Sequence, residues 1–418
     1  MKNLHHLFFA LCFVSLIFSS CNQDPANELT NQEAPGTEYT DGEIIPDQYI
    51  FMFDAEMIKP SLSYFDAEGI DDRAQKTSLV KQHDETVLNQ IDDFLNKYQI
   101  EKTDVLHTYT VAQAGIAVRL SKAKFQEVQG AEEIEFVEYD RMVPAPEFKI
   151  ESVDEVVVRA QTTPCGINNA GGSANGDGNK WIWIIDSGID LNHPDLNVQT
   201  ASPYARTFTG SNADDCNGHG THVAGTAGAR NNSIGVVGVS RGAVVVPVRV
   251  FNCTGGSPTS RIVAGVNHVN THNIAGDVVN MSLGGYFGSG CSGSSSYRAG
   301  LFALSDQGTW VSLAAGNSGA NAAFYQPACV NRSRVLTVSS MTCGRSWSSF
   351  SNYNMNPVDF IATGSSVYST WKNGGYATIS GTSMAAPHVA GICHVRQARP
   401  RGVGSVNNRG ENYPIAKR

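Results

Sequence analysis

Residues 380–391, SGTSMAAPHVAG, place a serine and a histidine among small and apolar residues. Ser383 is a candidate nucleophile, and His388 is the nearest candidate base. If the segment is helical from Thr382, residues five positions apart differ by about 140° around the helix axis. His388 then points away from Ser383 and is interpreted as a packed or capping histidine, so the base must lie elsewhere in the chain.

Residues 215–225, DCNGHGTHVAG, offer a better base in His219. Gly218 and Gly220 flank it, which allows a close backbone approach and the opening of a helix directly after the imidazole. His219 and His222 are alternatively an i, i+3 metal pair. No glutamate lies between them, however, and no third ligand stands at a recognisable spacing.

Two further polar residues follow apolar runs that are typical of buried strands. Asp186 ends the run WIWII, and Asn317 ends the run LAAG. In open α/β sheets the functional side chains lie beyond the carboxyl ends of strands, although an aspartate there alternatively only starts a turn. Because Asp186, His219 and Ser383 occur together at glycine-bounded ends, we interpret them as one set.

This set predicts acyl transfer that needs no cofactor for the chemistry. His219 removes the proton of Ser383 as the hydroxyl attacks a carbonyl, Asp186 orients the imidazole, and water later releases the acyl-enzyme. The oxyanion needs fixed donors, which the side-chain amide of Asn317 and the backbone N–H of Ser383 supply.

The rest of the chain contains the elements that must position these residues. From about residue 160, apolar runs alternate with helical stretches and predict an α/β domain with a largely parallel sheet. The strand-like runs are residues 181–185, 244–250, 278–281, 310–313 and 335–338. Before them, residues 49–53, 87–98, 105–109, 115–120, 121–128 and 135–139 follow the order β-α-β-β-α-β of a small ferredoxin-like α+β unit.

The N-terminal residues resemble an export signal, and Phe-Ser-Ser-Cys, ending at Cys21, resembles a bacterial lipoprotein cleavage box. An ordinary signal peptide followed by an incidental cysteine is the alternative. In either case we expect an exported protein, secreted or held at the cell envelope. The expected segments are a signal at 1–20, a polar tether at 21–44, the ferredoxin-like unit at 45–142, an exposed cleavable linker at 143–159 and the α/β domain at 160–418.

Composition narrows the functional class. The 418 residues include 41 glycines, 41% hydrophobic residues and 17% charged residues, which suits a large globular domain rich in tight turns. The formal net charge of -9 gives no basic surface for nucleic acid or an anionic membrane, so neither is an expected partner. Membrane contact is expected only through a lipid on Cys21.

Seven of the nine cysteines follow residue 160. None forms a CxxC pair, and an oxidising compartment favours disulfides, so an odd number leaves at least one thiol free. Cys393, in an apolar helical pattern, is the predicted buried free thiol. The other six are Cys165, Cys216, Cys253, Cys291, Cys329 and Cys343.

The segments IDSG, GHGTHVAG, AAGN and GTSMAAPHVAG resemble the subtilisin-like serine proteases of peptidase family S8 in identity and in chain order. The order Asp, His, Ser separates this family from chymotrypsin-like and α/β-hydrolase enzymes. QTTP, DCNG and VRVFNC are most similar to the proteinase K branch. The resemblance covers about residues 160–395, and residues 46–140 are more weakly similar to an inhibitor I9-type propeptide.

The resemblance implies a subtilisin-like three-layer fold and a serine endopeptidase. It gives Asp186, His219 and Ser383 the roles of a catalytic triad and Asn317 that of the oxyanion donor. Residues 282–284 then form one wall of the primary specificity pocket and an edge for an extended substrate, and residues 314–316 form the opposite wall. These wall residues are Ser282, Leu283, Gly284, Ala314, Ala315 and Gly316.

Small wall residues, and the absence of charge in residues 321–324, predict broad specificity with a preference for an apolar or aromatic side chain before the cut bond. Cys216 and Cys253 match a disulfide of the branch. Cys165 suggests an additional bridge with no assigned partner, and the pairing of Cys291, Cys329 and Cys343 stays open.

Asp359 resembles a calcium ligand of the family, but a plain turn aspartate is the alternative, because the neighbouring segment differs in length from the family pattern. No metal-binding residue is therefore assigned, and a structural calcium ion stays open. The polar residues after Arg396 predict that the terminal helices of many relatives are shortened or absent.

We also expect the propeptide to assist folding and then to inhibit the active site as an intramolecular partner. Self-cleavage is expected between about residues 155 and 161, to release a monomer that acts on proteins and peptides. Two alternatives stay open: a peptide-binding protein on a protease fold with little turnover, and a processing protease with few targets.

Overall fold

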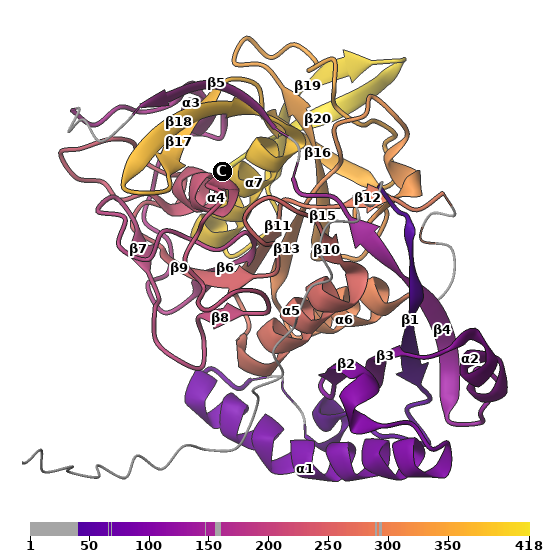
Figure 1. Cartoon of the computed structure of the whole chain (residues 1–418). Coiled ribbons are helices and arrows are strands. Elements are labelled where there is room, and N and C mark those ends of the chain that lie inside the picture. The colour runs from indigo at the N-terminus through magenta and orange to yellow at the C-terminus, as the bar shows by residue number, and fades with distance from the viewer. Residues whose placement is uncertain are drawn as a thin grey trace, which may run out of the picture. The chain divides into compact units, whose positions relative to one another are not determined.

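The computed structural model describes residues 41–65, 67, 69–146, 148–154, 160–288, 291 and 295–418. The predicted signal peptide, Cys21 and most of the predicted tether lie outside the described residues, as do residues 155–159 of the predicted cleavage region. The chain from Tyr39 to Arg418 forms one compact unit, in which a small antiparallel sheet precedes a large parallel one (Figure 1).

The N-terminal part of this unit follows the predicted order β-α-β-β-α-β. Its strands lie in the order β4-β1-β3-β2, and every pairing among them is antiparallel. The long helix begins after Asp72, whose carboxylate accepts a hydrogen bond from the N–H of Gln75. The elements are β1 (Ile44–Phe53), α1 (Arg73–Lys97), β2 (Val105–Tyr109), β3 (Gly115–Arg119), α2 (Lys122–Val128) and β4 (Ile134–Val143), with short 3-10 turns at Ser61–Tyr64 and Lys102–Asp104.

The larger sheet has the strand order β19-β20-β16-β15-β13-β11-β6-β9-β7, and its pairings from β20 to β7 are parallel. Its central strands are apolar runs buried on both faces, as the sequence predicts. They are β6 (Trp181–Asp186), β7 (Asn197–Val198), β8 (Arg206–Thr207), β9 (Val244–Arg249), β11 (Val278–Met281), β13 (Trp310–Ala314), β15 (Val335–Met341) and β16 (Val358–Thr363).

Helices cover both faces of this sheet, which gives three layers. On one face α4 and α7 share a buried cluster with the sheet, and on the other α5 and α6 do so. The predicted α/β fold, with its largely parallel sheet and preceding α+β unit, is therefore confirmed. The helices are α3 (Cys165–Asn169), α4 (His219–Gly228), α5 (Thr259–His272), α6 (Ser296–Asp306) and α7 (Thr382–Arg396), with a 3-10 turn at Ala322–Phe324.

Short strands surround the large sheet. The segment predicted as an exposed linker contains a strand, β5 (Lys149–Asp154), which pairs antiparallel with β18. After α7 the chain forms a hairpin whose second strand extends the large sheet next to β16, where only a short polar segment was expected. The remaining strands are β10 (Ser257–Pro258), β12 (Gly285–Tyr286), β14 (Tyr325–Gln326), β17 (Val367–Trp371), β18 (Gly375–Ser380), β19 (Arg401–Asn408) and β20 (Glu411–Lys417).

The cysteines after residue 160 form three disulfides, Cys165–Cys343, Cys216–Cys253 and Cys291–Cys329. The pairing of Cys216 with Cys253 is confirmed, and Cys165 gains the partner that the sequence did not supply. Cys393 is the free cysteine among the described residues and is buried, as predicted.

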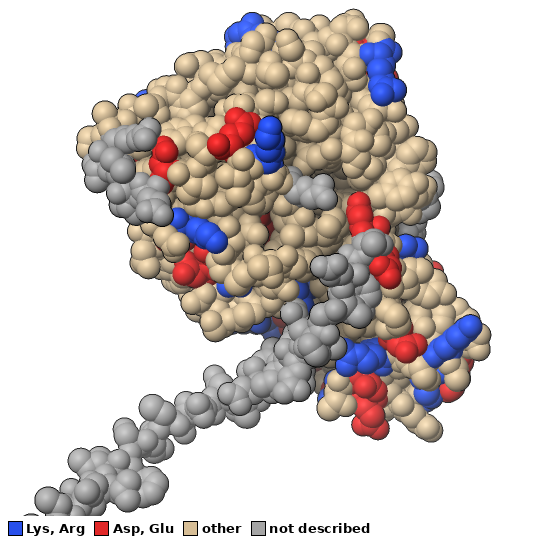
Figure 2. Space-filling view, turned by 45° about the horizontal axis from the view of Figure 1, so that its top comes forward, with Lys and Arg blue, Asp and Glu red and all other residues tan. Residues whose placement is uncertain are grey.

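Charged side chains are sparse on the face shown in Figure 2. On the face shown in Figure 2, the described Lys and Arg side chains stand singly or beside acidic ones. Among the helices that the structure describes, none has the length and apolar character needed to cross a bilayer.

Candidate active site

Asp186 and His219 form a fully buried pair. Asp186 ends β6 and His219 opens α4, and the Oδ1 atom of Asp186 lies 2.8 Å from Nδ1 of His219. The same oxygen accepts the N–H of Ser187 at 2.7 Å. Because a carboxylate is only an acceptor, Nδ1 carries the proton in this pair, and Nε2 of the neutral ring is the atom that can accept one. Nε2 is buried and has no hydrogen-bond partner.

The loop before α4 fixes the position of His219. Gly218 has a φ of 109°, and a Cβ there would meet the Trp371 ring at 2.5 Å, so this turn requires glycine. The Asp215 carboxylate accepts hydrogen bonds from the N–H groups of Gly218 at 2.8 Å and Thr221 at 2.9 Å. Asp215 therefore satisfies donors that the first turn of a helix leaves without partners.

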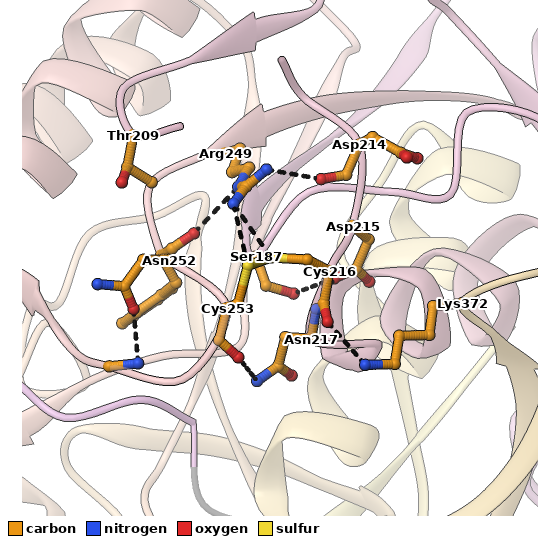
Figure 3. Close-up of a disulfide and its surroundings, with 12 residues drawn as sticks. Ser187, Thr209, Asp214, Asp215, Cys216, Asn217, Arg249, Asn252, Cys253 and Lys372 are labelled. Carbon is orange, nitrogen blue, oxygen red and sulfur yellow. Dashed lines mark hydrogen bonds between the residues drawn. A yellow bond between two sulfur atoms is a disulfide. The ribbon is translucent and has the colours of Figure 1, made fainter. Parts of the chain in front are cut away.

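The Cys216–Cys253 disulfide connects the same loop to the segment that follows β9 (Figure 3). Arg249 donates to Sγ of Cys216 at 3.1 Å, and Nζ of Lys372 donates to the Cys216 carbonyl at 2.7 Å. Asn217 donates to the carbonyl of Cys253 at 3.3 Å. These bonds connect the residues before His219 to two other segments of the chain.

Ser383 lies in the first turn of α7, and two hydrogen bonds connect it to Ser282. Oγ of Ser383 donates to the Ser282 carbonyl at 3.2 Å, and Oγ of Ser282 donates to the Ser383 carbonyl at 2.7 Å. Pro387 lacks the N–H that would otherwise bond to the carbonyl four residues earlier, that of Ser383. Pro387 thereby leaves this carbonyl available to Ser282, which accounts for a proline inside α7.

The side chain of Asn317 has a fixed orientation. Its Oδ1 accepts hydrogen bonds from both the N–H and the hydroxyl of Thr382, each at 2.8 Å. Since a backbone N–H only donates, the amide oxygen faces Thr382 and the NH₂ group is the end directed away from it. Asn317 and Ser383 line the same pocket.

This pocket brings together all six predicted wall residues. Residues 282–284 and residues 314–316 line it, and Tyr325 and Ala328 add uncharged side chains. Asp41, which precedes β1, also lines the pocket, and its carboxylate accepts the N–H of Tyr286 at 2.9 Å.

The chain's own residues 144–146 also line this pocket, a feature that sequence reasoning missed. Two residues further, the Phe148 ring stacks on His219, with centroids 5.2 Å apart and planes 25° apart. Pro146 and Phe148 are at most about 7 Å apart along the chain, so one short segment reaches both the pocket that Ser383 lines and the ring of His219. The sequence signal was the Val-Pro-Ala-Pro stretch, which favours extended backbone.

Two other histidines near the site have structural surroundings. His388 bonds through Nδ1 to the Met384 carbonyl at 2.8 Å and lies against Gly166, and burial lowers its pKa to about 4. His222 bonds through Nε2 to the Val367 carbonyl at 3.0 Å, and burial lowers its pKa to about 3. Both rings therefore stay neutral and donate to main-chain carbonyls.

The Asp359 carboxylate is already engaged. One oxygen accepts from the Arg399 guanidinium at 2.6 Å, and the other accepts from the N–H of Thr337 at 2.9 Å. A guanidinium at this carboxylate does not fit a calcium ligand, because it already balances the charge that the ion would. Among the described residues, no group of three or more His, Cys, Asp or Glu side chains converges in a way that could hold a metal ion.

The α+β unit contacts the helices on the far face of the large sheet. Asp140 of β4 accepts the N–H of Ser260 at 3.0 Å at the start of α5, and Glu138 accepts the N–H of Ser296 at 3.0 Å at the start of α6. Carboxylates favour helix N-termini. Burial raises the pKa of Asp140 to about 6.

Helix α1 makes a second polar contact with this face. Arg73 forms a buried two-pronged ion pair with Asp277, one bond of which measures 2.6 Å. Lys76 donates to the Asn273 carbonyl at 2.9 Å, and burial lowers the pKa of this lysine to about 7.

Comparison with known proteins places this chain in a family. The model of the subtilase family matches residues 178–407, more than half of the chain, and the model of peptidase inhibitor I9 matches residues 48–145. The chain is 32% identical over 399 residues to alkaline serine exoprotease A of Vibrio alginolyticus, covering 92% of this chain and 67% of that protein.

Two further relatives support the same family. The chain is 32% identical over 384 residues to the extracellular serine proteinase of Thermus sp. (strain Rt41A), covering 90% of this chain and 86% of that protein. It is 38% identical over 240 residues to subtilisin amylosacchariticus of Bacillus subtilis subsp. amylosacchariticus, covering 56% of this chain and 60% of that protein. The chain belongs to the subtilase family of serine proteases and carries a peptidase inhibitor I9 propeptide.

Proposed function

We propose that this subtilase cuts peptide bonds through Ser383 as nucleophile, His219 as general base and then acid, and Asp186 as the carboxylate that orients the imidazole. The observation that carries the proposal is the buried Asp186–His219 pair, which leaves Nε2 of a neutral imidazole as the proton acceptor. Ser383 donates to Ser282 while the propeptide is attached. Such hydrogen bonds often align only when substrate binds, so rotation of this hydroxyl toward Nε2 begins the reaction.

The oxyanion is stabilised by the Asn317 amide and the N–H of Ser383. The bonds from Thr382 support this role, since they direct the donor end of Asn317 away from Thr382. A donor that is already oriented needs no reorganisation as charge develops on the carbonyl oxygen. The chemistry requires no cofactor.

Specificity is broad, with a preference for an apolar or aromatic residue before the cut bond. Residues 282–284 and 314–316 act as the two walls of the specificity pocket, and their small side chains, with Tyr325 and Ala328, support an uncharged pocket. The proteinase K-like branch is supported by the QTTP, DCNG and VRVFNC segments and by the Cys216–Cys253 disulfide.

The propeptide inhibits the enzyme in cis by placing residues 144–146 across the substrate pocket, which is supported by their position in its lining. Self-cleavage, expected between about residues 155 and 161, then separates the α+β unit from a monomeric peptidase. Three disulfides and the export-like N-terminal sequence support a site of action outside the cytoplasm. Whether Cys21 carries lipid decides between secretion and anchoring.

Hydrolysis of denatured casein and of matched peptides by wild type and Ser383→Ala tests the proposal. We expect wild type to cut casein at many sites and to prefer Phe or Leu over Lys or Glu before the bond, whereas Ser383→Ala stays an uncut precursor. A few defined casein fragments would favour a narrow processing protease. Maturation of Ser383→Ala after purification free of other proteases would contradict self-cleavage.

A further inference from the structure

The strand β5 follows directly on the residues that cross the active site, and it pairs along the length of β18. The register runs from Lys149 opposite Ser380 to Asp154 opposite Tyr376, with a bulge between Ile379 and Thr378 at which Glu151 is the extra residue. Ser380 stands three residues before Ser383, so β18 ends close to the proposed nucleophile. Residues 144–146 line the proposed pocket for the residue before the cut bond, so β5, which follows them, is assigned to the downstream side. In the three-stranded sheet, β17 covers the other edge of β18, and β5 covers the edge that would otherwise be unpaired.

Most side chains of β5 stay exposed to solvent when the strand pairs with β18. Ile150 is 52% exposed and Val153 is 46% exposed. The strand is therefore held mainly by its backbone ladder, as in peptide recognition by strand addition, where main-chain hydrogen bonds give affinity and selected side chains give specificity. Another extended segment can make the same ladder.

Three side-chain contacts at regular spacing supply the specificity. The Phe148 ring stacks on His219 and meets the Trp371 ring edge-on, at centroid distances of 5.2 Å and 5.8 Å. Three residues further, the Glu151 carboxylate accepts the hydroxyl of Ser380 at 2.6 Å. Three residues further again, the Asp154 carboxylate accepts the hydroxyl of Tyr368 at 3.0 Å.

We propose that the edge of β18 that β5 covers here is a binding strand for the segment of a protein substrate downstream of the cut bond, and that it selects an aromatic residue followed by carboxylates three and six positions later. Here β5 stands in for that segment. The proposal rests on the endopeptidase function proposed above and adds a downstream specificity to it. His219 and Trp371 contact the aromatic ring, Ser380 binds the first carboxylate and Tyr368 the second.

The test compares internally quenched peptides with one common upstream sequence. Their downstream sequences are FKIESVD and its single variants Phe→Ala, Glu→Gln and Asp→Asn. With the mature enzyme, we expect each variant peptide to have a lower kcat/KM, by about three- to tenfold. This is the size of a hydrogen bond to a charged group at a partly exposed site for the Gln and Asn peptides, and of an aromatic contact for the Ala peptide. Equal kcat/KM for all four peptides would overturn the proposal.

Two enzyme variants assign the contacts. Ser380→Ala should abolish the Glu-over-Gln ratio and keep the Asp-over-Asn ratio, and Tyr368→Phe should do the reverse. Each readout is the ratio of the kcat/KM values of two peptides on one enzyme, so a general loss of activity cancels in the ratio. Ratios unchanged in both variants would contradict the assignment, and if one variant does not fold, the other decides.

A chromogenic amide with no residues downstream of the cut bond separates this proposal from the endopeptidase function. If wild type cuts neither this amide nor the peptides, the function itself is wrong. If it cuts the amide but treats all four peptides alike, only the binding strand is wrong.

Intact mass of the mature chain shows whether β5 has been removed. If β5 remains, it competes with the peptides, and Ile150→Pro, which cannot join the ladder, should raise kcat/KM for them. No rise would then contradict the proposal.

Discussion

Three buried histidines have the same side chain but different hydrogen-bond partners, and the partner distinguishes the proposed base from the other two. His219 bonds to a carboxylate, whereas His222 and His388 bond to main-chain carbonyls. A carboxylate stabilises the imidazolium that forms during proton transfer, and a carbonyl dipole does so far less. The sequence could predict His219 because its flanking glycines are local. The partners of Asn317 and Phe148 could not be predicted, because they come from distant segments.

Asp186→Asn tests the residue-scale account. The amide can donate to Nδ1 and so favour the wrong tautomer of His219, which should lower kcat by about 10⁴-fold while the circular dichroism spectrum stays unchanged. The matched control is Asp306→Asn, which removes an exposed ion pair with Arg332 and should change kcat little. An Asp186→Asn enzyme with most of the wild-type kcat would rule out the orienting role.

At the scale of elements, the site depends on how α4 and α7 begin. Gly218 and Asp215 set the start of α4, and Ser282 and Pro387 set the start of α7. The main strands and helices could be predicted from apolar periodicity. Strand β5 and the C-terminal hairpin could not, because β5 pairs with residues far along the chain and its exposed side chains carry no apolar pattern.

Gly218→Ala tests the start of α4 against a control with similar backbone. Gly242 also has positive φ, at 71°, but a Cβ there meets nothing within 4 Å. Gly242→Ala should lower the free energy of unfolding by about 1 kcal/mol, because alanine is strained at a positive φ. Gly218→Ala should lower it by about 3 kcal/mol, because the Trp371 ring must also move. Half-lives of heat inactivation and kcat measure both, and only Gly218→Ala should lower kcat. Equal effects would argue against the steric account.

At the scale of the whole molecule, the propeptide contacts the peptidase at the proposed substrate pocket and at helices α5 and α6. The second contact contains titratable groups. Oγ1 of Thr77, on α1, lies 2.8 Å from Nδ1 of His272, and burial, with nearby His268 and Lys76, lowers the pKa of His272 to about 2. The I9 resemblance could predict the inhibitor, but which polar groups meet at its interface depends on packing between distant segments.

Acid should therefore weaken propeptide docking through His272. The pKa of His272 is lowered in the docked state. Its contribution to docking is therefore complete above about pH 6.5 and declines as the pH falls toward the pKa of the docked state. A released imidazole that regains its ordinary pKa is mostly protonated at about pH 5.5, which shifts the docking equilibrium toward release by about tenfold. Asp140, with its raised pKa, acts in the opposite direction.

Comparison with His272→Asn cancels the effect of Asp140, which both chains contain. The lag before active enzyme appears should be measured after incubation at about pH 5.5 and pH 8, with activity assayed at one common pH. The acceleration by acid should be about tenfold larger in wild type than in the variant. The same acceleration in both would show that His272 does not sense pH here.

The central claim is that one serine, Ser383, carries the acyl group between substrate and water. The most direct measurement is peptide mass spectrometry of the mature enzyme after treatment with a sulfonyl fluoride, which reacts with activated serine hydroxyls, alongside casein hydrolysis. We predict one adduct, on Ser383, that forms in step with the loss of activity and does not form in Asp186→Asn at a comparable rate. Full inactivation with the adduct on another residue, or full activity with Ser383 modified, would contradict the account.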